Sequence, residues 1–206
     1  MLPNGRSERD YTPRRKTPVI LSAGRLWDAA KNLTALEAVA PGLDWPVHVA
    51  GSTSQPTGGV RSTHGVCALG ELPPEDLARH LSRAAIYALP ARYEPFGQTA
   101  LEAALSGCAL VLGDIASLRE VWGPAALYVA PDDHDALREC LMRLIADPRL
   151  RRRQAAKALA RALHFTPERM VDAYLSAYRA VSAARADEAG VAGLVTKRRV
   201  EAACAS

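Results

Sequence analysis

The 206-residue chain has few cysteines and no long apolar run, and each shortage excludes a class of protein. Its four cysteines lie far apart and form no Cys-x-x-Cys pair, which argues against a disulfide framework or a zinc site and indicates reduced thiols in a cytoplasmic protein. Residues 1–16 lack the apolar core of a signal peptide. The longest uncharged apolar stretch, Ala103–Gly113, is too short to cross a bilayer, so we expect any contact with the inner membrane surface to be peripheral.

Several catalytic signatures are missing as well. The sequence contains no H-E-x-x-H, G-x-S-x-G, Walker A or G-x-G-x-x-G motif, so zinc hydrolysis and a serine nucleophile have no support. The net charge is +4, but the basic residues gather in two short clusters, 14–16 and 151–153, without interleaved aromatic residues. This distribution favours anionic small ligands over nucleic acid.

Short apolar segments alternate with helical patterns along most of the chain. The predicted strands are Val19–Leu21, Pro46–Ala50, Gly65–Leu69, Ile86–Leu89, Cys108–Leu112 and Ala126–Val129. This alternation predicts an α/β fold with a doubly wound, Rossmann-like parallel sheet in one domain over residues 17–184. Residues 1–16 have the composition of a linker, and we expect residues 185–206 to be a mobile tail.

Two cations follow the first predicted strand. Ligands of doubly wound sheets bind at the carboxyl ends of the strands, and Arg25 and Lys31 fall on that edge, close to the start of a helix. Together with free helix N–H groups they could neutralise a diphosphate without a metal ion. The alternative is that both are solvated surface cations.

Two carboxylates flank the start of another predicted helix. Glu94 precedes the helix and should lie beside the amides of Gly97, Gln98 and Thr99, where it could cap the helix or share its N-terminus with ligand hydroxyls or phosphate oxygens. Glu102 belongs to a polar stripe on the same helix and suits a pair of neighbouring hydroxyls, such as those of a ribose. Its alternative is simple exposure to solvent.

Two further acidic motifs are predicted to be helix caps. Asp133-His134-Asp135 fits the D-x-D pattern of metal-dependent sugar transferases, but it directly precedes an amphipathic helix, so capping explains the acids and we predict no metal site. The stretch from Ser117 to Glu120 has the pattern of a capping box for a short helix.

The ten residues Glu94-Pro-Phe-Gly-Gln-Thr-Ala-Leu-Glu-Ala resemble the signature of retaining glycosyltransferases of family four, the glycosyl transferases group 1. Gly24-Arg25, Lys31-Asn32, Leu69-Gly70 and Gly113-Asp114 also resemble that family, in order and at plausible spacing. The resemblance covers Pro3 to Val181. It implies a GT-B fold, of which this chain would be the second domain, the one that binds the nucleotide-sugar donor.

The resemblance also implies roles for individual residues. Arg25 and Lys31 would hold the donor diphosphate, and Glu94 would be the catalytic carboxylate at the sugar. The remaining donor contacts would come from Phe96, Gly97, Gln98 and Thr99 near the sugar, Glu102 at the ribose, and Gly70, Glu71 and Leu72 near the base. The family uses neither metal nor cofactor, and its acceptors are saccharides or other glycan precursors.

The acceptor-binding first domain of that family has no counterpart in this sequence. Residues 2–5 resemble the connection between the two domains. A cleft closed on one side cannot orient an acceptor, so we expect turnover to require a separate acceptor domain. The apolar face of Val171–Val181 should then be exposed. The alternatives are a non-catalytic nucleotide-sugar binding module, a truncated inactive transferase, and a non-enzymatic interaction domain in which the two carboxylates only cap and solvate a helix.

Overall fold

The computed structural model describes residues 2–56 and 58–182, and its centre is a parallel sheet of six strands. The strands are β1 (Thr17–Ala23), β2 (Val47–Ala50), β3 (Cys67–Gly70), β4 (Ala84–Leu89), β5 (Ala109–Gly113) and β6 (Leu127–Val129). Their order is β3-β2-β1-β4-β5-β6, with every neighbouring pair parallel. The predicted doubly wound sheet is confirmed, and its direction of winding reverses between β1 and β4.

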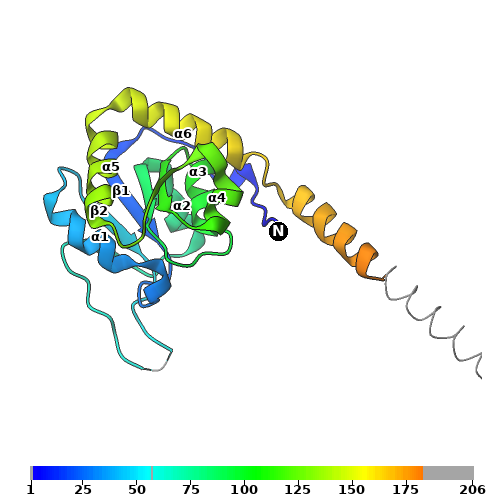
Figure 1. Cartoon of the computed structure of the whole chain (residues 1–206), viewed down its shortest axis with the longest axis horizontal. Coiled ribbons are helices and arrows are strands. Elements are labelled where there is room, and N and C mark those ends of the chain that lie inside the picture. The colour runs from blue at the N-terminus through cyan, green and yellow to red at the C-terminus, as the bar shows by residue number, and fades with distance from the viewer. Residues whose placement is uncertain (1, 57, 183–206) are drawn as a thin grey trace, which may run out of the picture.

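Helices cover both faces of the sheet (Figure 1). They are α1 (Leu33–Val39), α2 (Pro74–Arg83), α3 (Gln98–Leu105), α4 (Ala116–Trp122), α5 (His134–Ala146), α6 (Pro148–Ala162) and a last helix over 167–182; short 3-10 turns are η1 (Glu8–Asp10), η2 (Ala29–Lys31), η3 (Ala40–Gly42) and η4 (Gly123–Ala125). Apolar residues of α1 and α5 pack in one core, and those of α2, α3 and α4 pack in the other. None of the described helices is long and apolar enough to cross a bilayer.

The middle strands supply both cores because successive side chains of a strand point to opposite faces. In β4, Ile86 joins the core under α1 and α5, while its neighbour Tyr87 joins the core under α3. All residues of β4 and β5 are buried, which explains why these strands read as continuous apolar runs in the sequence. Strand β4 begins two residues earlier than predicted, because Ala84 pairs with Thr17 of β1.

The helix over 167–182 extends away from the sheet and its covering helices, as Figure 1 shows in orange. Its apolar residues Val171, Tyr174, Leu175, Tyr178 and Val181 are each between 38% and 68% exposed. The predicted exposure of this face is confirmed for the part of the chain that the structure describes. The expected tail, 185–206, lies outside the described residues.

The acids of the D-x-D pattern lie where a cap would place them. Asp133 is the N-cap of α5, and its carboxylate accepts a hydrogen bond from the Ala136 amide at 2.9 Å. The capping prediction is confirmed. Among the described residues, no three His, Cys, Asp or Glu side chains are grouped as metal ligands would be.

Candidate functional site

The candidate site lies at the carboxyl edge of the sheet, where the loops after β1 and β4 separate. Strands β1 and β4 are adjacent in the sheet, and the chain leaves them toward opposite faces, which is the position where doubly wound sheets bind their ligands. The β1 loop carries Lys31, and the β4 loop carries Glu94. The fold therefore joins two segments that are 63 positions apart in the sequence.

Lys31 and Glu94 form the central pair of this edge. The Lys31 ammonium donates to Glu94 Oε2 at 2.6 Å, and the two side chains are only 16% and 14% exposed. Glu94 Oε1 accepts hydrogen bonds from the amides of Gly97 at 2.9 Å and Phe96 at 3.3 Å. One carboxylate is thus held between a cation and the N-terminal end of α3.

The position of Glu94 beside the α3 N-terminus agrees with the prediction, but the amides it contacts differ. Gly97 was expected, whereas the second donor is Phe96 and not Gln98 or Thr99. Gly97 is the N-cap residue with φ +83°, a left-handed conformation that turns the chain back toward Glu94 and favours glycine. Glu94 occupies the Gly97 amide, but Gly97 has no side chain with which to cap α3, so the amides of the first helical turn can still receive ligand oxygens.

Ser117 fixes the main chain at Glu94, a role that the sequence did not suggest. The predicted capping box is wrong: α4 begins at Ala116 with Ile115 as its N-cap, so Ser117 is not the capping residue. Ser117 lies inside the first turn instead, and its hydroxyl donates to the Glu94 carbonyl oxygen at 2.6 Å. The local sequence has the pattern of a cap, but the carbonyl that accepts the Ser117 hydrogen bond lies in the loop after β4.

We expect Ser117→Ala to lower the free energy of unfolding by about 1 kcal/mol, the usual net contribution of one hydrogen bond. Urea denaturation followed by circular dichroism measures this difference. Ser117→Thr keeps the hydroxyl and serves as the control. Equal midpoints for wild type and Ser117→Ala would show that the bond to Glu94 contributes nothing.

Four predicted donor residues line one cavity at the same edge. The cavity is about 260 Å³ and is lined by Arg25, Glu71, Leu72 and Thr99, together with small residues of the loops after β1 and β2. Gly51 allows these two loops to approach, since a Cβ there would lie 1.7 Å from the Gly24 carbonyl oxygen. Gly70 supports the same region because its carbonyl accepts the Gly51 amide at 2.8 Å.

Arg25 lies more exposed than Lys31. Its side chain is 62% exposed, pairs with Asp28 at 2.7 Å, and lies over the Trp27 ring at 5.4 Å from the centroid. The same Asp28 caps η2 by accepting from the Ala30 amide at 2.9 Å. The two predicted phosphate cations therefore differ: Lys31 is held in place by Glu94, and Arg25 can leave a partly exposed ion pair.

Glu102 lies under the N-terminal segment instead of facing open solvent. The residue is 7% exposed, and its carboxylate accepts from the Arg6 Nε at 2.9 Å. The Arg6 guanidinium also lies against the side-chain amide of Gln98. Thr99, on the same helix, points to the sheet and is hydrogen-bonded to the Tyr87 hydroxyl at 2.5 Å and to the Ala23 carbonyl at 3.3 Å.

With this geometry in view, the family can be assigned. The sequence profile described as "Glycosyl transferases group 1" matches residues 17–147. The chain belongs to this family.

Relatives and solved structures agree with the assignment. The chain is 34% identical over 111 residues to O-antigen chain mannosyltransferase B of Escherichia coli, covering 54% of this chain and 29% of that protein. It is 37% identical over 95 residues to glycogen synthase of Mycobacterium tuberculosis, covering 45% and 23%. A sucrose-phosphate synthase from Thermosynechococcus elongatus superposes with a TM-score of 0.76 at 25% identity, covering 89% of this chain and 52% of that one.

The group 1 glycosyl transferase described here thus has the Rossmann-like architecture of GT-B glycosyltransferases. The structure of TarM shares the fold, with a TM-score of 0.64 at 15% identity over 85% of this chain and 37% of that one. The aligned segments span less than a third of the curated relatives and about half of the synthase structure.

Two residues that shape the site, Arg6 and Asn32, were given no role from the sequence. Arg6 belongs to the segment read as a linker, and no local pattern links it to Glu102, 96 positions away. Asn32 is 1% exposed with φ +56°, and its amide donates to the carbonyls of Pro90 at 2.9 Å and Pro131 at 2.7 Å. Asn32 thereby ties the loops after β1, β4 and β6 together, next to Lys31.

Proposed function

We propose that the chain is the donor-binding half of a retaining glycosyltransferase, which transfers a sugar from a nucleoside diphosphate donor to a saccharide or other glycan precursor. The observation that carries this proposal is the Glu94 carboxylate held by Lys31 and by the amides of Phe96 and Gly97 at the switch between β1 and β4. A donor at this edge meets a cation, a carboxylate and the N-terminal end of α3 together.

Each part has a defined task in the proposed reaction. Lys31 and Arg25 neutralise the diphosphate as it leaves, and the dipole of α3 adds partial positive charge at its N-terminus, so no metal ion is needed. Glu94, an acceptor-only group when ionised, holds the sugar hydroxyls. The cation and helix therefore act on the charge that grows in the transition state.

The base and ribose are proposed to lie on the α2 side of the site. Leu72 and Leu77 give the 260 Å³ cavity an apolar wall against which a base can pack, with Glu71 beside them. Glu102 on α3 is the acceptor for the ribose hydroxyls. Turnover also requires an acceptor domain, because the described residues line only the donor side of the cleft. We place the protein in the cytoplasm, with any contact with the inner membrane surface peripheral.

Calorimetric titration of the chain with UDP, GDP and ADP tests the proposal. We expect one of the three to bind, and Glu102→Ala to weaken that nucleotide by about 1.5 kcal/mol, the low end for a hydrogen bond to a charged group because Arg6 already engages the carboxylate. Absence of binding for all three nucleotides would contradict the proposed function.

Two other outcomes identify the alternatives. A non-catalytic binding module would bind the nucleotide but give no turnover when acceptors and a related first domain are supplied. An interaction domain would show nucleotide binding that is indifferent to both Arg25→Ala and Glu102→Ala.

A further inference from the structure

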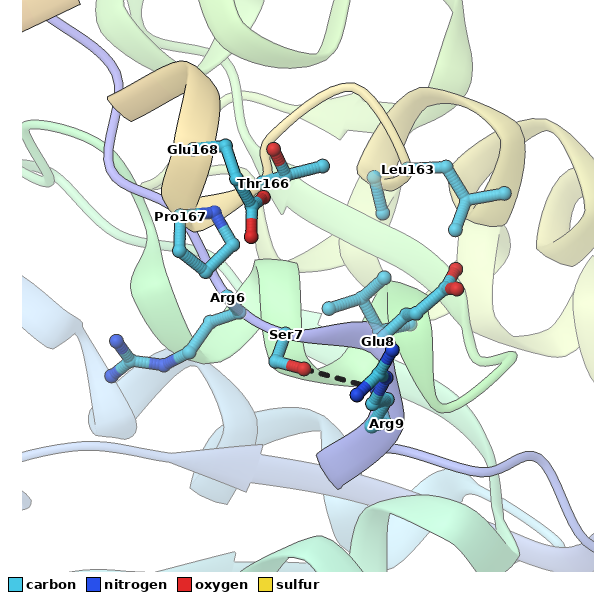
Figure 2. Close-up of a pocket in the computed structure, with 10 residues that line it drawn as sticks. Arg6, Ser7, Glu8, Arg9, Leu163, Thr166, Pro167 and Glu168 are labelled. Carbon is cyan, nitrogen blue, oxygen red and sulfur yellow. Dashed lines mark hydrogen bonds between the residues drawn. The ribbon is translucent and has the colours of Figure 1, made fainter. Parts of the chain in front are cut away.

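The N-terminal segment is fixed against the turn that follows α6. The Arg6 amide donates to the Phe165 carbonyl at 3.0 Å. Gly5 packs against the peptide bond between Thr166 and Pro167. A Cβ on Gly5 would lie 2.4 Å from the Thr166 carbonyl oxygen. Figure 2 shows this segment beside Thr166 and Pro167, with the Arg6 side chain directed away from those of Glu8 and Arg9. The backbone at Arg6 is therefore held, while the side chain reaches to α3.

The Arg6 side chain covers the carboxylate that the proposed function assigns to the ribose. It contacts Glu102 at 2.9 Å and also lies against the Gln98 amide, so it spans two polar residues of α3. The side chain of Arg6 is 35% exposed, whereas that of Glu102 is 10% exposed. The arginine is thus the more exposed member of the pair, and its guanidinium occupies Oε1 of the carboxylate.

The second polar neighbour of Glu102 comes from the same segment. Burial, together with the charge of Glu102, raises the pKa of Tyr11 to about 12. A phenol is neutral when protonated and anionic when ionised, so Tyr11 cannot replace Arg6 as the counter-charge of Glu102.

We infer that Arg6 is a gate on the donor site, and that a nucleotide must displace its guanidinium from Glu102 before the ribose hydroxyls can bind. This inference rests on the proposed function, and it adds a residue that sets the affinity for the donor. A partly exposed ion pair restrains such an exchange by about fivefold, equivalent to about 1 kcal/mol. This fivefold cost is small enough for the hydrogen bonds of two ribose hydroxyls to offset. Only the side chain of Arg6 has to move, because its backbone is held.

The test compares the full chain with Arg6→Ala by calorimetry, using UDP, GDP and ADP and then the 2′,3′-dideoxy form of whichever binds. We expect Arg6→Ala to bind the ribonucleotide about fivefold more tightly, because the carboxylate is already uncovered. The dideoxy nucleotide, which has no hydroxyls for Glu102, should bind wild type and Arg6→Ala equally. Combining Arg6→Ala with Glu102→Gln should remove the fivefold gain in affinity for the ribonucleotide.

Arg9→Ala is the matched control, since Arg9 lies on the same segment and makes no ion pair with Glu102. It should leave both affinities unchanged. Thermal melting verifies that each variant is folded, and Arg6→Gln replaces Arg6→Ala if the latter is not. Unchanged or weaker ribonucleotide binding by a folded Arg6 variant, with wild type binding normally, overturns the gate alone. No binding by either protein overturns the proposed function and the gate with it.

Discussion

Lys31→Met is expected to weaken nucleoside diphosphate binding by about 10- to 100-fold and to lower the free energy of unfolding by about 2 kcal/mol. Both effects follow from the loss of the ammonium: the diphosphate loses a proposed cation, and Glu94 loses its ion-pair partner. The ammonium makes a 2.6 Å contact with Glu94, and side chains that are 16% and 14% exposed have little water to replace the lost partner. The same ammonium is the less exposed of the two cations proposed for the diphosphate. Calorimetry measures the binding and urea denaturation the stability.

A double variant separates the two effects. In Lys31→Met with Glu94→Gln the unpaired charge is gone, and the new amide oxygen can still accept from Phe96 and Gly97. We therefore expect the stability to recover while nucleotide binding stays weak. Recovery of binding in the double variant would show that Lys31 acts only as the partner of Glu94 and does not contact the phosphates.

Arg25→Met is the matched control because it removes the other proposed phosphate cation. Its side chain is 62% exposed and its ion pair with Asp28 lies at the surface, so the stability should change by less than about 1 kcal/mol. We expect a loss of nucleotide affinity with almost no loss of stability. Both cations would then contribute to nucleotide affinity, but only Lys31 would contribute to the stability of the fold.

The sheet could be predicted from the sequence because its signals are local. The central strands β4 and β5 are buried throughout, and a buried strand appears as a continuous apolar run such as Cys108–Leu112. The α3 helix could likewise be placed from its composition and from Gly107, which has φ +78° just beyond the helix. Once strands alternate with helices, the position of the loops after β1 and β4 on one edge follows.

The partners of the site residues could not be predicted, because they come from distant segments. The polar stripe on the helix correctly groups Gln98 with Glu102, since Arg6 contacts both residues. No pattern in the sequence around Glu102 predicts that its partner is an arginine 96 positions earlier. Ser117 shows the same limit. Its hydroxyl has the spacing of a cap, and the fold directs it to the Glu94 carbonyl instead.

Lys16 provides the second large expected effect. In the sequence it stands with Arg14 and Arg15 as one basic cluster, but burial lowers its pKa, and its ammonium points inward. It donates to the carbonyls of Ser106 at 2.6 Å, Ser82 at 3.1 Å and Leu81 at 3.3 Å. These carbonyls lie at the C-terminal ends of α2 and α3, where the helix dipoles favour a cation.

We expect Lys16→Met to lower the free energy of unfolding by about 2 kcal/mol. The methionine keeps the apolar stem, so the loss reports the ammonium and its three carbonyl contacts. The Ser106 carbonyl has the shortest of these contacts, and Ser106 is fully buried, so water cannot readily take the place of the amine. Urea denaturation of the variant and of wild type measures the difference.

Arg15→Met is the control for Lys16→Met, since it removes a neighbouring charge of the same cluster. Arg15 is exposed and makes no ion pair within residues 2–56 and 58–182, so its replacement should change the stability by less than about 0.5 kcal/mol. If the two variants lost the same stability, the effect would come from net charge and not from the ammonium. A loss confined to Lys16→Met would show that the segment read as a linker stabilises the C-terminal ends of α2 and of α3, the helix that carries Glu102.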